Sequence, residues 1–266
     1  MNSNSYMEEF INKLKFSLNK FNYLQKKFSQ EELDNSLIEK IYFGCNKIFK
    51  ITINKNDILY NYVIKSTIFI WGETNNEYEI LENIKNPKYI VPIYDNIFFN
   101  NSFYYLMEFV NKTEDDIDLI KKFKQITQCV KELHDNNIIH LDIHKNNFIF
   151  DSDKKIYRVI DFELSKNKGD HFDISRMFGN SFKYPPEIHN SKRVEIFFDI
   201  FGLLTLFYEL AFHRPIFFNK DEYVNKKIIL NHHDERCNIF LEYILNNYQK
   251  INCDDILNFT EKNFNL

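Results

Sequence analysis

The chain has 266 residues, of which 44% are hydrophobic, and a formal net charge of −4 at pH 7. This is enough apolar material for one large domain or for two lobes around a cleft. Both charge signs are interspersed, so no basic stripe indicates a nucleic acid partner. The sequence shows no signal peptide and no run near the roughly 18 apolar residues of a membrane span. The cysteines form no Cys-x-x-Cys pair, which favours a soluble protein in a reducing cytoplasm.

The first segment with a clear pattern, residues 6–27, is predicted to be an amphipathic helix. Phe10, Leu14, Phe21 and Leu24 recur at helical spacings among polar residues. The polar side mixes both charge signs, which favours packing on the following domain over a role at a membrane surface. We assign residues 1–35 to an N-terminal helical extension.

The pattern changes to the alternation of strands between residues 37 and 66. Apolar and aromatic runs at 41–43, 48–53 and 58–64 are separated by Asn, Lys and Asp, which predicts an antiparallel meander. A helical pattern at 76–84 follows, then strands at 89–99 and 103–109, and helix dominates beyond residue 115.

This order of elements predicts an α+β fold of two lobes over residues 36–262. The smaller lobe, at about 36–110, would hold an antiparallel β-sheet and one main helix. The larger lobe, at about 111–262, would be mainly helical.

The most informative segment lies between short apolar runs of the larger lobe. Residues 139–147 read Ile-His-Leu-Asp-Ile-His-Lys-Asn-Asn, and Asp161 comes directly after a further apolar run. Phosphoryl transfer requires a metal ion held against the phosphates and a carboxylate aimed at the attacking hydroxyl. Asp142 would orient that hydroxyl, while Asn147 and Asp161 would offer oxygen ligands to the metal.

The same residues allow a simpler interpretation. His140, Asp142 and His144 could form a transition-metal site, or they could be polar residues of a turn. The apolar strands predicted on both sides of the loop favour phosphoryl transfer.

Taken in chain order, the segments resemble the eukaryotic protein kinase superfamily over residues 36–257. Tyr62-Val63-Ile64-Lys65 is similar to the Val-Ala-Ile-Lys strand of that family. Glu77 is similar to the helical glutamate that pairs with the lysine of this strand. The stretch 104–110 is similar to the hinge that contacts adenine.

The resemblance continues in the sequence that follows the catalytic loop, residues 139–147. The run 179–187 ends in Tyr-Pro-Pro-Glu and resembles the end of the activation segment. Asp199 resembles the start of the buried helix that anchors the catalytic loop. Lys250 stands where the family has the arginine that pairs with the glutamate at the Glu187 position, and lysine keeps the charge without the bidentate fork.

The resemblance implies an ATP-dependent phosphotransferase, a serine/threonine-type protein kinase that acts on a protein hydroxyl, with ATP and Mg²⁺ or Mn²⁺ as cofactors. It implies that Asp142 is the base, that His144 or Lys145 steadies the γ-phosphate, and that Asn147 and Asp161 hold the metal. The nucleotide would be bound by Gly44, Ile48, Val63, Lys65, Glu77, Met107, Glu108, Val110 and Ile149. We expect a monomer in the cytoplasm, or in the host cytoplasm if the protein is viral or a secreted effector.

Several residues depart from the family pattern. The glycine-rich loop keeps only Gly44, which limits close approach of the backbone to phosphates. Leu141 replaces the arginine of kinases that are switched by activation-loop phosphorylation, and Glu163 replaces the glycine after Asp-Phe. His144 gives the loop the Asp-x-His-x-x-Asn pattern of aminoglycoside and choline kinases, so a small-molecule kinase is the alternative enzyme. The eroded glycine loop leaves a pseudokinase scaffold as a third hypothesis.

Overall fold

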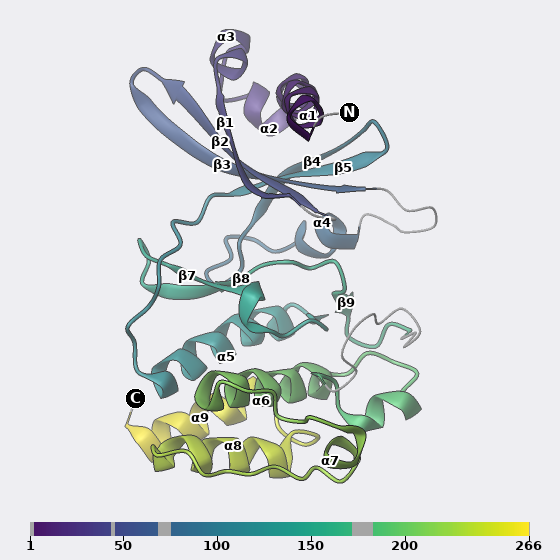
Figure 1. The fold of residues 1–266 in the computed structure, drawn as a ribbon, viewed down its shortest axis with the longest axis vertical. Helices are drawn as coiled ribbons and strands as arrows, with labels where there is room; N and C mark the ends of the chain where they lie inside the picture. Colours follow the sequence, from purple (N-terminus) through teal and green to yellow (C-terminus); the bar gives the residue numbers. More distant parts are fainter. Residues whose placement is uncertain (1–2, 44–45, 69–75, 172–182, 266) are drawn as a thin grey trace. The chain divides into compact units, whose positions relative to one another are not determined.

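The computed structural model describes residues 3–43, 46–68, 76–171 and 183–265 (Figure 1). The chain forms two compact units. The first comprises Met1–Asn83 with Val91–Val110, and the second comprises Ile84–Ile90 with Asn111–Leu266. The predicted α+β organisation is confirmed, because the first unit holds an antiparallel sheet and the second is mainly helical.

The first unit is built on a five-stranded antiparallel sheet with the order β1-β2-β3-β5-β4. Its strands are β1 Leu37–Phe43, β2 Lys47–Lys55, β3 Ile58–Ile68, β4 Ile93–Phe99 and β5 Ser102–Glu108. The β2–β3 and β4–β5 hairpins each turn through two residues with positive φ, Asn56-Asp57 and Asn100-Asn101. Asparagine and aspartate tolerate this left-handed conformation, which matches the strand twist in a two-residue hairpin.

Three helices at the start of the chain cover one face of this sheet (Figure 1). They are α1 Ser3–Leu18, α2 Asn22–Gln25 and α3 Gln30–Asp34. One hydrophobic core joins Leu14, Leu18, Phe21, Leu24, Phe28 and Leu33 of the helical segment to Phe49, Ile51, Ile53, Tyr62, Ile64, Tyr104 and Leu106 of the sheet. Because side chains alternate along a strand, the neighbouring residues of β2 and β3 face the other side of the sheet.

Residues 6–27 do not form the single helix that the spacing predicted. The first helix ends at Leu18, and a turn at Asn19-Lys20 leads into α2. The Lys20 N–H donates to the carbonyl of Ser17 at 2.9 Å, which closes this turn. The bend is favoured because it brings the fully buried Phe21 into the same core as Leu14.

The second unit is mainly helical and contains two short two-stranded sheets. Its helices are α5 Leu119–Asp135, α6 Ile196–Phe212, α7 Lys220–Val224, α8 Glu235–Asn247 and α9 Cys253–Phe264, and its strands are β6 Ile138–Ile139, β7 Phe148–Asp151, β8 Ile156–Val159 and β9 Lys166–Asn167. Helix α6 is apolar on nearly all sides and forms the centre of the unit. Phe123 of α5 stacks on Phe207 of α6 and on Phe240 of α8, with ring centroids 4.2 Å and 5.4 Å apart.

None of the helices in the described part of the chain is both long enough and apolar enough to cross a membrane.

Residues 89–92 differ from the strand predicted over 89–99. The strand β4 begins at Ile93, after Pro92, because proline cannot donate to the ladder. Tyr89 instead accepts from the Val159 N–H at 2.8 Å and donates through its own N–H to Glu132 at 2.7 Å. Tyr89 therefore packs within the second unit, to which residues 84–90 belong, whereas Pro92 belongs to the first.

The core under the N-terminal helices yields a stability prediction. Phe21→Ala should lower the free energy of unfolding by about 3 to 5 kcal/mol, because it empties a fully buried site. Phe16→Ala, on a neighbouring turn, should cost less than about 1 kcal/mol because this ring is 60% exposed. Urea unfolding of both variants measures the difference. Equal losses would show that the two rings contribute alike and would contradict this account of the core.

Candidate active site

In the first unit, the predicted nucleotide-binding residues of the sheet share one face. Ile48 lies opposite Lys65 in the β2–β3 ladder, and Met107 lies opposite Val63 in the β3–β5 ladder. Because Val63 and Lys65 are two positions apart on β3, all four side chains project from the same side of the sheet. This is the face opposite to the one covered by the N-terminal helices, whose core contains Tyr62 and Ile64.

Lys65 and Glu77 form a buried ion pair on this face. The Lys65 ammonium lies 3.0 Å from Oε2 and 3.3 Å from Oε1 of Glu77. Glu77 comes from the first turn of α4, Asn76–Leu81, which is shorter than the predicted helix at 76–84. The two side chains are only 6% and 2% exposed. Removing either charge would leave the other buried without its partner, which is strongly unfavourable.

The predicted hinge forms the end of β5 and the residues after it. Met107 is buried, and the Glu108 N–H donates to the carbonyl of Pro92 at 3.2 Å. Val110 is also buried, at the end of the first unit. Gly44, predicted to approach the phosphates, lies outside the described residues.

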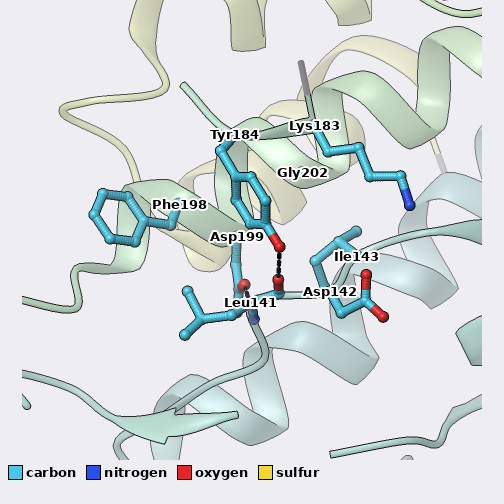
Figure 2. A pocket seen from close by; sticks show the side chains of 8 residues that line it. All are labelled: Leu141, Asp142, Ile143, Lys183, Tyr184, Phe198, Asp199 and Gly202. Atoms are coloured by element: carbon cyan, nitrogen blue, oxygen red, sulfur yellow. Dashed lines mark hydrogen bonds between the residues drawn. The ribbon is translucent and has the colours of Figure 1, made fainter. Parts of the chain in front are cut away.

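In the second unit, the Asp199 carboxylate fixes the backbone of the catalytic loop. It accepts from the His140 N–H at 2.7 Å and from the Leu141 N–H at 2.9 Å. Leu141 has a φ of 63°, an unfavourable conformation for a branched side chain. Its carbonyl accepts from the Tyr184 hydroxyl at 2.6 Å (Figure 2). Hydrogen bonds on both sides of this residue therefore hold the strained backbone that presents Asp142.

The Asp142 carboxylate is bound by two side chains of its own loop. Its Oδ2 atom lies 3.1 Å from Nε2 of His144 and accepts from Nδ2 of Asn147 at 3.2 Å. Burial opposes ionisation of this carboxyl, but the hydrogen bond and the charge of His144, followed by the charges of Lys183 and His140, outweigh burial and hold the pKa of Asp142 below its ordinary value. The group is therefore a carboxylate at neutral pH.

Both histidines of the loop use their ring nitrogens in hydrogen bonds. His144 accepts from the Asn146 N–H at Nδ1, and its Nε2 atom faces Asp142. His140 accepts from the Asp142 N–H at Nδ1 and contacts the Ile160 carbonyl through Nε2 at 3.1 Å. His140 has no nitrogen left for a metal, so the alternative of a transition-metal site at His140, Asp142 and His144 is not supported.

Asn147 and Asp161 offer the oxygen ligands that a divalent metal of the Mg²⁺ type prefers. Asn147 ends the 3₁₀ turn Lys145–Asn147, is 3% exposed, and uses Nδ2 to bind the carbonyl of Asp142 at 2.9 Å. Because Nδ2 is engaged in this bond, Oδ1 is the atom of the amide that could bind a metal. The Ile160 N–H donates to the Asn147 carbonyl at 2.9 Å, which ties Asp161 to this turn. A carboxylate oxygen of Glu163 lies within 4.8 Å of one of Asp161.

Lys145 and Ile149, which the sequence also assigned to the site, make contacts away from Asp142. Lys145 is 58% exposed and pairs with Glu209 of α6 at 2.8 Å, so its ammonium is directed to that carboxylate. Ile149 lies on β7, half-buried, opposite Arg158 of β8.

The partner of Glu187 differs from the one that the sequence predicted. Glu187 binds the Lys226 ammonium at 2.9 Å and the Tyr248 hydroxyl at 2.8 Å. Lys250 is exposed beyond the end of α8, so its assignment as the partner was wrong. Lys226 lies just after α7, a position for which the sequence carries no signal because only folding brings it beside Glu187.

Sequence reasoning also gave no role to Lys183 and Tyr184. Both lie beside Asp142 around a small cavity (Figure 2). The signal that could have found them is their place directly before Pro-Pro-Glu, because a segment that ends at an anchored glutamate is held near the catalytic loop.

Comparisons with known proteins place these features in a family. The model of the protein kinase domain matches residues 63–262. A probable serine/threonine-protein kinase of Dictyostelium discoideum is 26% identical over 213 residues, which cover 67% of this chain and 45% of that protein. The serine/threonine-protein kinase PSK1 of Saccharomyces cerevisiae is 33% identical over 142 residues, which cover 49% of this chain and 9% of that protein. The chain thus spans less than half the length of both relatives.

A solved structure agrees with this fold. The kinase PK-1 of Cydia pomonella granulovirus superposes with a TM-score of 0.67 over 85% of this chain and 94% of that chain, at 19% sequence identity. The family match covers most of the chain and includes Lys65, Glu77, Asp142, Asn147 and Asp161. The chain belongs to the protein kinase family.

Proposed function

We propose that this protein is an ATP-dependent protein kinase that transfers the γ-phosphoryl group of ATP to a serine or threonine hydroxyl of a protein. The observation that carries the proposal is the geometry around Asp142, whose ionised carboxylate is held by His144 and Asn147. The buried Lys65–Glu77 pair supports it, because a fold without catalytic use for this pair has no need to bury two charges. The names of the relatives support the serine/threonine class.

Each residue has a defined task in this proposal. Both side-chain bonds to Asp142 go to Oδ2, so Oδ1 is the atom that would accept the hydrogen bond of the attacking hydroxyl. Lys65 would bind phosphate oxygens of the nucleotide, with Glu77 keeping its ammonium in place. Ile48, Val63 and Met107 would contact the adenine side of the nucleotide, and Val110 and Glu108 would offer backbone groups.

The donor set fits a divalent metal of the Mg²⁺ type, because Asn147 and Asp161 supply an amide oxygen and a carboxylate. We propose Mg²⁺ or Mn²⁺ as this metal. When bound, it neutralises charge on the phosphates of ATP. The Glu163 carboxylate, which lies near Asp161, would add a further oxygen donor to this set.

The remaining expectations are proposals of the same kind. Residues 36–262 would form the kinase domain and residues 1–35 an extension, whose side chains pack in the core of the first unit. We propose a monomer in a reducing compartment, and the buried free thiols of Cys129, Cys237 and Cys253 fit such a compartment.

The first test is phosphotransfer from Mg-ATP to a mixture of proteins, read by mass spectrometry. Asp142→Asn should lower kcat by about 10² to 10⁴-fold, because it removes the carboxylate that orients the acceptor hydroxyl. Lys65→Ala should abolish measurable transfer as well. Lys192→Met, a change at an exposed lysine of the second unit, should leave the rate within about twofold.

The acceptor decides between the kinase hypotheses. Phosphoserine or phosphothreonine in the mixture supports the proposal. Transfer to an aminoglycoside or to choline alone would replace it with the small-molecule kinase. Absence of both transfer and Mg-ATP binding would support the pseudokinase scaffold.

Tyr184 yields a separate prediction. Tyr184→Phe removes the hydroxyl that binds the strained Leu141 carbonyl, so kcat should fall by about tenfold while the KM for ATP changes little. Tyr42→Phe, at a ring that is 55% exposed, is the matched control and should behave like wild type. Steady-state kinetics with the protein substrate found above measures both. A normal kcat for Tyr184→Phe would show that Asp199 alone suffices to hold the loop.

A further inference from the structure

A buried chain of polar side chains connects the last helix of the second unit to Asp199. His134, in the last turn of α5, lies with Nε2 3.0 Å from Oδ2 of Asp199. Its other ring nitrogen, Nδ1, lies 3.6 Å from Sγ of Cys253, the first residue of α9. The side chains of His134 and Asp199 are 6% and 0% exposed, and Cys253 is also buried. Water therefore has little access to either contact.

The contact with His134 completes the surroundings of the Asp199 carboxylate. Its Oδ1 atom accepts from the Leu141 N–H, and Oδ2 accepts from the His140 N–H. Both donors belong to the loop that the carboxylate has to hold, whereas His134 comes from a helix of the core. A carboxyl group turns readily about its Cβ–Cγ bond. A third partner on a rigid helix limits this rotation and keeps both oxygens directed at the loop.

The position of Cys253 is fixed by the start of α9 and by its packing on α5. Asn252 caps the helix by accepting from the Asp255 N–H at 3.1 Å. Lys131 of α5 pairs with Asp254 at 3.1 Å. These contacts hold the thiol beside Nδ1, so both ring nitrogens of the histidine have a partner. Rotation of the ring by half a turn would place carbon atoms against the carboxylate and the thiol instead, which makes the observed orientation the favoured one.

We propose that His134 is a positioning residue of the phosphotransfer site and that Cys253 sets the orientation of its ring. The inference rests on the proposed function. The carboxylate that His134 holds keeps Leu141 in its left-handed conformation, and this conformation directs Asp142. The geometry of the loop thus depends on α5 and α9 as well as on α6.

The first arm of the test needs no enzymatic activity. Hydrogen exchange of backbone amides is followed by NMR on the full chain. His134→Asn removes the partner of Oδ2 and should accelerate exchange of the His140 and Leu141 N–H groups by about tenfold relative to Leu241 of α8. His134→Gln, whose side-chain nitrogen reaches the position of Nε2, should stay within about threefold of wild type.

The reference amide separates positioning from general stability. An equal acceleration at Leu241 would show that the whole unit is destabilised and would overturn the proposal. Unchanged exchange at both loop amides would overturn it as well.

The thiol is tested by its own set of variants. Cys253→Ala should accelerate exchange at the same two loop amides by about threefold, and Cys253→Ser should recover most of this change, because its hydroxyl can also donate. Cys237→Ala, at another buried cysteine, is the matched control and should leave these two amides unchanged. Cys253→Ala keeps the partner of the buried carboxylate, so it tests the connection even if His134→Asn fails to fold. Wild-type exchange in Cys253→Ala would reject the role of the thiol.

The second arm measures kinetics with Mg-ATP and the protein substrate. His134→Asn should lower kcat by about tenfold with little change in the KM for ATP, and His134→Gln should restore most of the loss. His233→Gln, at an exposed histidine, should behave like wild type. Equal kcat values for His134→Asn and His134→Gln would show that the bond to the carboxylate is not what matters and would overturn the inference.

The two arms separate the inference from the proposed function. Absence of transfer by the wild-type protein counts against the kinase activity, while hydrogen exchange still decides whether His134 holds the loop. Transfer by the wild type together with a normal kcat in His134→Asn supports the activity and rejects the role of His134.

Discussion

The geometry of the catalytic loop depends on the buried carboxylate of Asp199. A charge without solvent is tolerated only where hydrogen bonds replace water, and here the Asp199 oxygens bind His134 and the N–H groups of His140 and Leu141. These bonds hold Leu141 in a left-handed conformation that it would otherwise leave. The direction of Asp142 follows from that conformation. The orientation of the Asp142 carboxylate thus depends on a residue far along the chain.

In the first unit, the two faces of the sheet have different surroundings. One face lies under the N-terminal helices and is apolar, while the other carries Lys65, whose charge is held by Glu77. The alternation of side chains along β3 separates these roles between neighbouring residues. A shift of the β2–β3 register by one residue would bury the lysine under the helices. The two-residue turn at Asn56-Asp57 sets this register and therefore also determines the face of the sheet on which Lys65 lies.

The sequence was informative where chemistry and local pattern coincide. Asp142 and Asn147 lie on one short loop, so their contact follows from their spacing. The strands were visible because alternation is a local property. The partners of Lys145 and Glu187 were not predictable, since Glu209 and Lys226 approach them only through the packing of α6 and α7. The bend after Leu18 was missed because helical spacing continues through a turn that the core, and not propensity, imposes.

The packing of the N-terminal helices has a consequence for where the folding unit begins. The stretch that matches the protein kinase domain starts at residue 63, within β3, although β2 supplies the ladder on one side of that strand. A polypeptide that began there would expose an unpaired edge at β3 and uncover Ile64, Tyr104 and Leu106. Such an edge is a template for aggregation. The start of the family match therefore does not coincide with the start of the segment that forms the hydrophobic core of the first unit.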